Sequence, residues 1–195
     1  MNTNISNSPF SRRSIGFTIA TLALIGWSNC WHGPGSCAAA PSQTPVFGPA
    51  TEATLKSPQR RTAELLDLDT GARATSTTFG ENDRETHAWI RTNKLDALGV
   101  VEKGHIAVLC MDVAVVPAPS NHWDKATASE VVTNWGLGQQ EPNKITAISP
   151  VTEKTDTFFF RTREDGLGVL QIRGQSDDPL GVRIRYRLVK QTGAK

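Results

Sequence analysis

The sequence lacks the motifs that would identify an enzyme or a metalloprotein. None of the G-x-S-x-G, H-E-x-x-H, C-x-x-C or phosphate-loop patterns occurs. We therefore predict no metal site and no cofactor, and the sequence identifies no catalytic residue. Beyond residue 39, the chain also has no excess of positive or negative charge. Residues 1–39 contain Arg12, Arg13 and no acid, so the rest of the chain has 19 basic and 19 acidic residues. This balance argues against nucleic acid as a partner.

Cysteine is scarce, with three in the chain. If the N-terminus is cleaved near Ala39, only Cys110 remains, and an intramolecular disulfide is excluded. Cys110 lies in the apolar run Ile106–Met111. We therefore predict a buried small hydrophobic residue rather than a reactive nucleophile.

The N-terminus contains an export signal. A polar stretch ends in Arg12 and Arg13, and the apolar run Ser14–Trp27 follows. A transmembrane helix needs about 20 apolar residues, so this run has the length of a signal-peptide core. Residues 1–39 are thus predicted to be an export signal of the general secretory type. The mature protein would be periplasmic, envelope-anchored or secreted.

Two endings of the signal remain open. Cys30 follows the apolar run at the position of a lipoprotein's lipid-bearing cysteine, which would anchor the mature protein to the membrane. Alternatively, the small residues Cys37–Ala40 offer an ordinary cleavage site, which would release a soluble protein. In either case, we expect membrane contact only through the signal or the lipid.

Proline marks the next boundary. Residues 40–60 contain Pro41, Pro45, Pro49 and Pro58 and are predicted to be an extended linker. Residues 61–195 have the length of one domain.

Near the start of this domain, Glu64–Gly71 alternates leucine with acidic residues, which predicts a half-buried strand that ends in a turn. Asp67 and Asp69 share one face of this strand and could begin a metal or acid–base site. With no third ligand nearby, a solvated face beside an Asp-Thr-Gly turn is favoured.

Helices are predicted near residues 84–93 and 127–135. Asp83 is a suitable N-cap for the first, and Thr127 with Glu130 forms a capping box for the second. Between them, the apolar run Ile106–Val116 predicts a central strand that is buried on both faces. Asp112 interrupts this run. A buried acid needs a partner, so Asp112 is paired, at an edge, or functionally placed.

The C-terminal third predicts a three-stranded antiparallel meander, because Thr157–Arg163, Gly168–Arg173 and Gly181–Val189 alternate with period two. The fold class is accordingly α+β, with a mainly antiparallel sheet and two short helices. Apolar residues fill one face of the meander, which assigns the arginines to the other face. These are Arg161, Arg163, Arg173, Arg183, Arg185 and Arg187.

The arginine face has three interpretations. It could contact an acidic envelope protein or an anionic ligand, since the guanidinium group suits carboxylate and phosphate. It could equally be a solvated strand face, or pair with the domain's own acids. From Phe158 onward eight basic residues stand against four acidic ones, so residues 40–157 carry the compensating negative charge.

Part of the chain resembles a known module. The tail R-T-R-E-D-G-L-G-V-L-Q-I, which begins at Arg161, and G-V-R-I-R-Y-R-L-V, which begins at Gly181, are similar to the end of an uncharacterised bacterial extracytoplasmic module. Leu65–Gly71 and Trp123–Thr127 match as well. Such modules occur alone or appended to membrane zinc peptidases of the antirepressor sensor type. The resemblance implies no activity, and Asp165 replaces a glycine that is usual in the pattern.

Together these observations favour a non-catalytic binding or sensory module of the cell envelope, with an unknown ligand. One alternative is a small exported hydrolase, for example one built on Asp112, His122 and Asp124. The three histidines of the mature domain, His87, His105 and His122, lie in different predicted elements, and spacing alone does not bring them together. A purely structural envelope protein is the other alternative.

Overall fold

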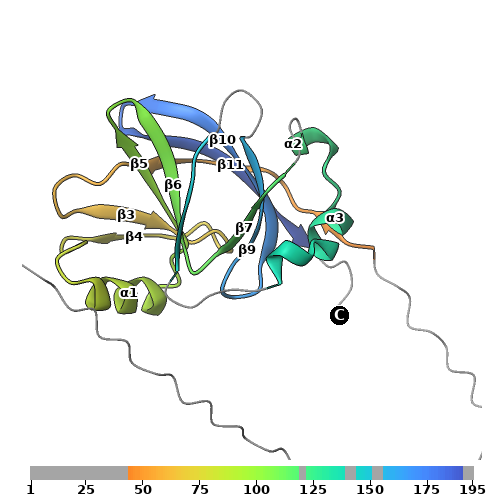
Figure 1. Cartoon of the computed structure of the whole chain (residues 1–195), viewed down its shortest axis with the longest axis horizontal. Helices are drawn as coiled ribbons and strands as arrows, with labels where there is room; N and C mark the ends of the chain where they lie inside the picture. The colour runs from red at the N-terminus through yellow and green to blue at the C-terminus, as the bar shows by residue number, and fades with distance from the viewer. Residues whose placement is uncertain (1–43, 119–121, 139–143, 151–155, 191–195) are drawn as a thin grey trace, which may run out of the picture. The chain divides into compact units, whose positions relative to one another are not determined.

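Alternating apolar residues build two antiparallel sheets, which pack face to face (Figure 1). The computed structural model describes residues 44–118, 122–138, 144–150 and 156–190. The chain divides into the units Met1–Ala40 and Pro41–Lys195, and every described residue belongs to the second. No helix within the described ranges has the length and hydrophobicity to span a lipid bilayer.

The first sheet has the order β4-β3-β5-β6-β8. Its strands are β3 (Ala63–Leu66), β4 (Arg73–Ser76), β5 (Ala97–Glu102), β6 (His105–Met111) and β8 (Ile145–Ile148). The second sheet has the order β1-β11-β10-β9-β7, and β2 also pairs with β11. Its strands are β1 (Val46–Phe47), β2 (Thr51–Lys56), β7 (Ala114–Pro117), β9 (Thr157–Arg161), β10 (Leu167–Asp177) and β11 (Leu180–Lys190).

Helices cover the outer faces of both sheets (Figure 1). They are α1 (Asp83–Thr92), α2 (His122–Lys125), α3 (Ala128–Thr133) and the 3-10 helix η1 (Trp135–Leu137). Ile90 of α1 packs on the first sheet, and Val131 of α3 packs on the second. Each sheet therefore has an apolar residue on both faces at successive positions, as in Cys110 and Met111 of β6.

The predicted meander is confirmed as β9, β10 and β11. Phe160 pairs with Gly168, and Leu170 pairs with Tyr186, in antiparallel register. Phe159 and Val169 of the meander pack on the outer face against Trp123 and Val131. The other buried apolar residues of the meander face the first sheet. These are Phe158, Phe160, Leu170, Ile172, Val182, Ile184 and Tyr186. The connection between β10 and β11 is shorter than predicted, because both strands continue to the turn at Asp178 and Pro179.

Both predicted helices are present, and their caps differ in part from the expectation. The capping box of Thr127 and Glu130 is confirmed at α3. At α1 the N-cap is Asn82 rather than Asp83, since the side chain of Asn82 accepts from the backbone of Arg84 and Glu85. Asp83 lies in the first turn, where its negative charge favours the helix N-terminus.

Two expectations are corrected by the strand pairing. Part of the predicted linker 40–60 is not a linker, because β1 and β2 both pair with β11. The apolar run Ile106–Val116 is not one strand. Asp112 has a φ of 56°, and this left-handed residue sends β6 into the first sheet and β7 into the second. An apolar run shows burial on both faces, but it does not show whether the chain changes sheets.

Candidate functional site

The turn after β3 is folded by the carboxylate of Asp67. Its Oδ1 accepts hydrogen bonds from the backbone N–H of Asp69 (2.8 Å) and Thr70 (3.1 Å), and its Oδ2 accepts from the Thr70 hydroxyl (2.6 Å). Gly71 completes the turn with a φ of 77°, which glycine adopts without strain. Asp67 is buried, so the predicted solvated strand face is wrong at this residue.

Asp96 approaches this turn from the segment between α1 and β5. Its backbone N–H donates to Leu66 (2.9 Å), and its Oδ2 accepts from the N–H of Leu68 (2.9 Å). Asp96 is 0% exposed, and its Oδ1 makes no hydrogen bond within the described part of the chain. Burial, reinforced by the charges of Asp69 and Asp67, raises the pKa of Asp96 to about 8.

Asp69 lies against the β9–β10 turn. The Thr162 hydroxyl donates to its carboxylate, and burial raises the pKa of Asp69 above its usual value. Gly166 permits this approach, because a Cβ at that position would lie 1.7 Å from Oδ1 of Asp69. The close packing leaves Oδ2 of Asp69 buried without a hydrogen bond to any described residue.

Asp67, Asp69 and Asp96 therefore form one acidic cluster, with one oxygen atom of each within 4.8 Å of the others. Across the described ranges, it is the one group of three potential metal ligands that lie this close together. From the sequence, only Asp67 and Asp69 are expected to lie together. Asp96 lies 28 residues after Leu68, and only the pairing of β3 with β5 brings it near.

Asp112 is paired, which is one of the three alternatives that the sequence left open. Its Oδ2 accepts from Arg91 Nε of α1 (2.7 Å) and lies 3.5 Å from Nη1 of Arg163. Its backbone N–H donates to the carbonyl of Lys144 (2.9 Å). This residue thus connects the change of sheet after β6 to α1 and to the β9–β10 turn.

The predicted arginine face is largely covered. Arg187 Nη2 donates to the carbonyl of Trp123 (2.5 Å), and its guanidinium lies over the rings of Phe47 (4.1 Å) and Trp123 (4.9 Å). Arg185 lies 4.3 Å from the Trp123 ring and donates to Gln171 (2.6 Å). Both side chains therefore serve to attach α2 to the second sheet.

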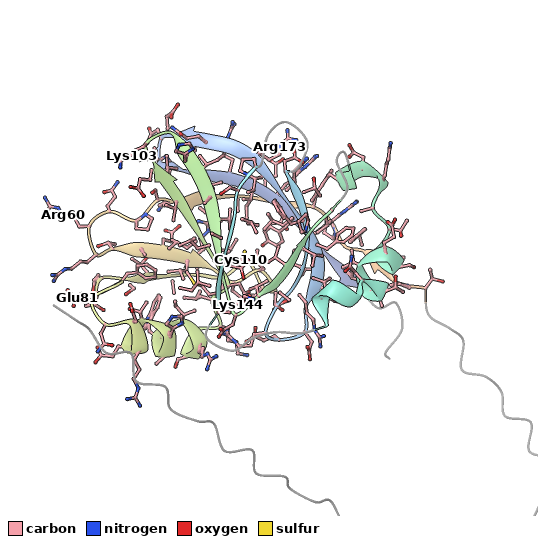
Figure 2. All side chains as sticks on the ribbon, in the orientation of Figure 1. Arg60, Glu81, Lys103, Cys110, Lys144 and Arg173 are labelled. Carbon is pink, nitrogen blue, oxygen red and sulfur yellow. The ribbon has the colours of Figure 1, made fainter. Side chains whose placement is uncertain are left out.

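The other four arginines have three different environments. Arg161 pairs with exposed Asp165 in the β9–β10 turn (2.6 Å), whereas Arg163 contacts Asp112 on the other side of that turn. Arg173 and Arg183 are exposed at the far end of β10 and β11, and Figure 2 shows Arg173 at the edge of the fold. The six residues do not form one continuous surface.

The described side chains among the remaining predicted residues lie on different elements. His87 is half-buried on α1, and His105 is exposed at the start of β6. His122 begins α2, and its side chain lies outside the described residues, as does Cys30. Cys110 is buried between the sheets as predicted (Figure 2), and burial raises its pKa to about 12.

Arg187 provides a stability test of the covered face. We expect Arg187→Ala to lower the free energy of unfolding by about 2 kcal/mol, because a charged hydrogen bond and two cation–π contacts are lost. Arg183→Ala removes an exposed arginine from the same strand and should change it by no more than about 0.5 kcal/mol. Urea denaturation of both variants measures the difference, and equal losses would contradict the assignment.

Comparison of the chain with protein-family models, curated proteins and solved structures finds no match in any of the three.

Proposed function

We propose that this protein is a non-catalytic binding or sensory module of the bacterial cell envelope. The export signal, the absence of catalytic motifs and the resemblance of the tail to an extracytoplasmic module support this proposal. We also assign the fold to the α+β class, since helices cover the outer faces of two antiparallel sheets.

The observation that carries the proposal is a cleft at the exposed end of the arginine face. Arg173 and Arg183 line it together with Glu52 and Thr54 of β2, and its volume is about 260 Å³. Neither arginine forms an ion pair with a described residue, although Arg173 lies 3.5 Å from the amide oxygen of Gln171. Two guanidinium groups thus remain available to a ligand.

The chemistry of this cleft suits an anionic group. A guanidinium presents parallel N–H donors that match a carboxylate or a phosphate, and two of them can hold one such group from both sides. Glu52 places one negative charge beside them, which disfavours a small, highly charged anion and favours a group that also carries a donor. An acidic segment of an envelope protein meets both conditions.

The test uses a tetraglutamate peptide and inorganic phosphate as probes. We expect the full chain to bind the peptide in low salt and to lose affinity as salt is added. Arg173→Ser with Arg183→Ser should weaken binding by up to roughly 30-fold, since an exposed charged contact contributes at most about 1 kcal/mol and two such contacts are lost. Isothermal titration calorimetry measures both effects.

A matched control removes the same kind of charge elsewhere. Arg84 is exposed on α1, so Arg84→Ser should leave peptide binding and thermal stability unchanged. The proposal is contradicted if the wild-type chain binds neither probe, or if the double variant binds as tightly as the wild type. The first result would favour a purely structural protein.

A further inference from the structure

The acidic cluster holds three carboxylates in a largely buried site. Asp96 is fully buried, and Asp67 and Asp69 lie beside it. A buried carboxylate is costly unless a proton, a cation or a full set of hydrogen bonds compensates it. Arg163 is a cation whose charge acts on Asp69, but its ion pairs go to Asp112 and Glu164. The arrangement calls for a further positive charge.

Two oxygen atoms in the cluster have no partner. Oδ1 of Asp96 and Oδ2 of Asp69 are buried and make no hydrogen bond to any residue that the structure describes. The bond from Leu68 to the other oxygen of Asp96 holds this carboxylate against the Asp67–Asp69 turn. Buried polar atoms are nearly always satisfied in folded proteins, so two in one cluster indicate that a ligand belongs there.

The donor set indicates which ligand fits. All three side chains offer oxygen, which hard divalent cations prefer, whereas zinc favours nitrogen and sulfur. Their oxygen atoms lie within 4.8 Å of one another. Calcium accepts several carboxylates in flexible geometry, whereas magnesium usually keeps several waters and is bound by one or two carboxylates. A set of three carboxylates therefore suits calcium.

A cleft borders the cluster at Asp69. A cleft of about 200 Å³ lies between the β3–β4 turn and β11, and Asp69, Thr70 and Gly71 form one of its walls. Tyr186 and Lys190 lie on the opposite side. Water entering through this cleft can supply the ligands that a six- to eight-coordinate cation needs beyond three carboxylates.

We propose that Asp67, Asp69 and Asp96 bind one calcium ion. The ion fixes the turn after β3 to the segment before β5 and, through Thr162 and Gly166, to the β9–β10 turn. It joins segments from both sheets at one end of the fold. This proposal is independent of the arginine cleft.

Thermal unfolding of the full chain tests the proposal. The protein is stripped with EDTA, dialysed at pH 7.5, and melted with calcium, magnesium, manganese or zinc chloride, or with potassium chloride at matched ionic strength. At a calcium concentration 100 times its Kd, the melting temperature should rise by about 5–10 °C. Magnesium should produce a smaller rise, and potassium chloride none.

Asp96→Asn is the decisive variant. Asparagine keeps the acceptor for the Leu68 N–H and removes the charge, so we expect a folded protein whose melting temperature no longer responds to calcium. Asp69→Asn, at the edge of the cluster, should lose the response as well and serves if Asp96→Asn fails to fold. Asp165→Asn removes an exposed charge from the β9–β10 turn, and its melting temperature should still respond to calcium.

Three results would overturn the proposal. One is a wild-type chain that shows no calcium shift. Another is a shift of equal size in Asp96→Asn or Asp69→Asn, which would mean that calcium acts elsewhere. The third is an equal shift from potassium chloride, which would show screening of surface charge alone. Titration calorimetry with calcium should give one site per chain in the wild type and none in Asp96→Asn.

Discussion

Replacing Asp112 by alanine is expected to lower the free energy of unfolding by about 3–5 kcal/mol, the range found when one partner of a buried ion pair is removed. Arg91 is 38% exposed at its side chain, so it can turn toward solvent. Arg163 cannot, because its Nη1 and Nη2 are buried and make no hydrogen bond to a described residue. Without Asp112, the guanidinium of Arg163 keeps its charge and loses one of its two ion-pair partners, so that only Glu164 (3.3 Å) remains among the described residues.

The backbone at Asp112 contributes separately. Its φ of 56° is left-handed, a conformation that asparagine and aspartate tolerate better than alanine, by about 1–2 kcal/mol. Asp112→Asn should therefore be less damaging than Asp112→Ala by about that amount. The decrease in the free energy of unfolding that remains in Asp112→Asn measures the contribution of the ion pair. Urea denaturation at pH 7 gives both values.

Asp165 provides a matched control. It also has a left-handed φ, 67°, and it also pairs with an arginine, but its side chain is 72% exposed. Asp165→Ala should cost about 1–2 kcal/mol, nearly all of it from the backbone, because exposed ion pairs contribute little. A loss at Asp165 as large as the loss at Asp112 would refute the argument from burial.

Much of the fold follows from local sequence patterns. Period two in the C-terminal third predicts β9, β10 and β11, and the capping box of Thr127 and Glu130 predicts α3. These signals are local, and they agree with the packing around them. The pattern fails at β2, where Thr51–Lys56 pairs with a strand that begins at Leu180. The four prolines in residues 40–60 lie on either side of that strand, and they carry no information on its distant partner.

The acidic cluster could be predicted only in part. Asp67 and Asp69 are two residues apart, but Asp96 joins them through the β3–β5 pairing and Thr162 through the β9–β10 turn. Likewise, strand periodicity assigns Arg185 and Arg187 to one face. It cannot show that Trp123, more than 60 residues earlier in the chain, covers them. The acidic cluster and the covered arginines both depend on contacts between distant segments, which a single sequence does not reveal.

In calcium-free buffer that contains EDTA, stability is expected to fall as the pH rises from about 4 to about 8. The pKa of Asp96 is about 8 in the folded protein, because burial disfavours the charged form, and its ordinary value is 3.8. Between these values the folded state holds a proton that the unfolded state has released, so deprotonation favours unfolding. The contribution of Asp96 is fully present below pH 4 and is lost by pH 8.

Comparison with Asp96→Asn isolates this residue. The free energy of unfolding of the wild type minus that of the variant should fall by about 1.4 kcal/mol per pH unit between pH 5 and pH 7, and by less as the pH approaches 8. The other titratable groups are the same in both proteins. Asp69, whose pKa is also raised, and Asp67 and Glu164, whose charges act on Asp96, are retained in both. Urea denaturation at four pH values measures the slope. A difference that does not change with pH would mean that Asp96 is ionised in the folded protein, compensated by a charge other than its own proton.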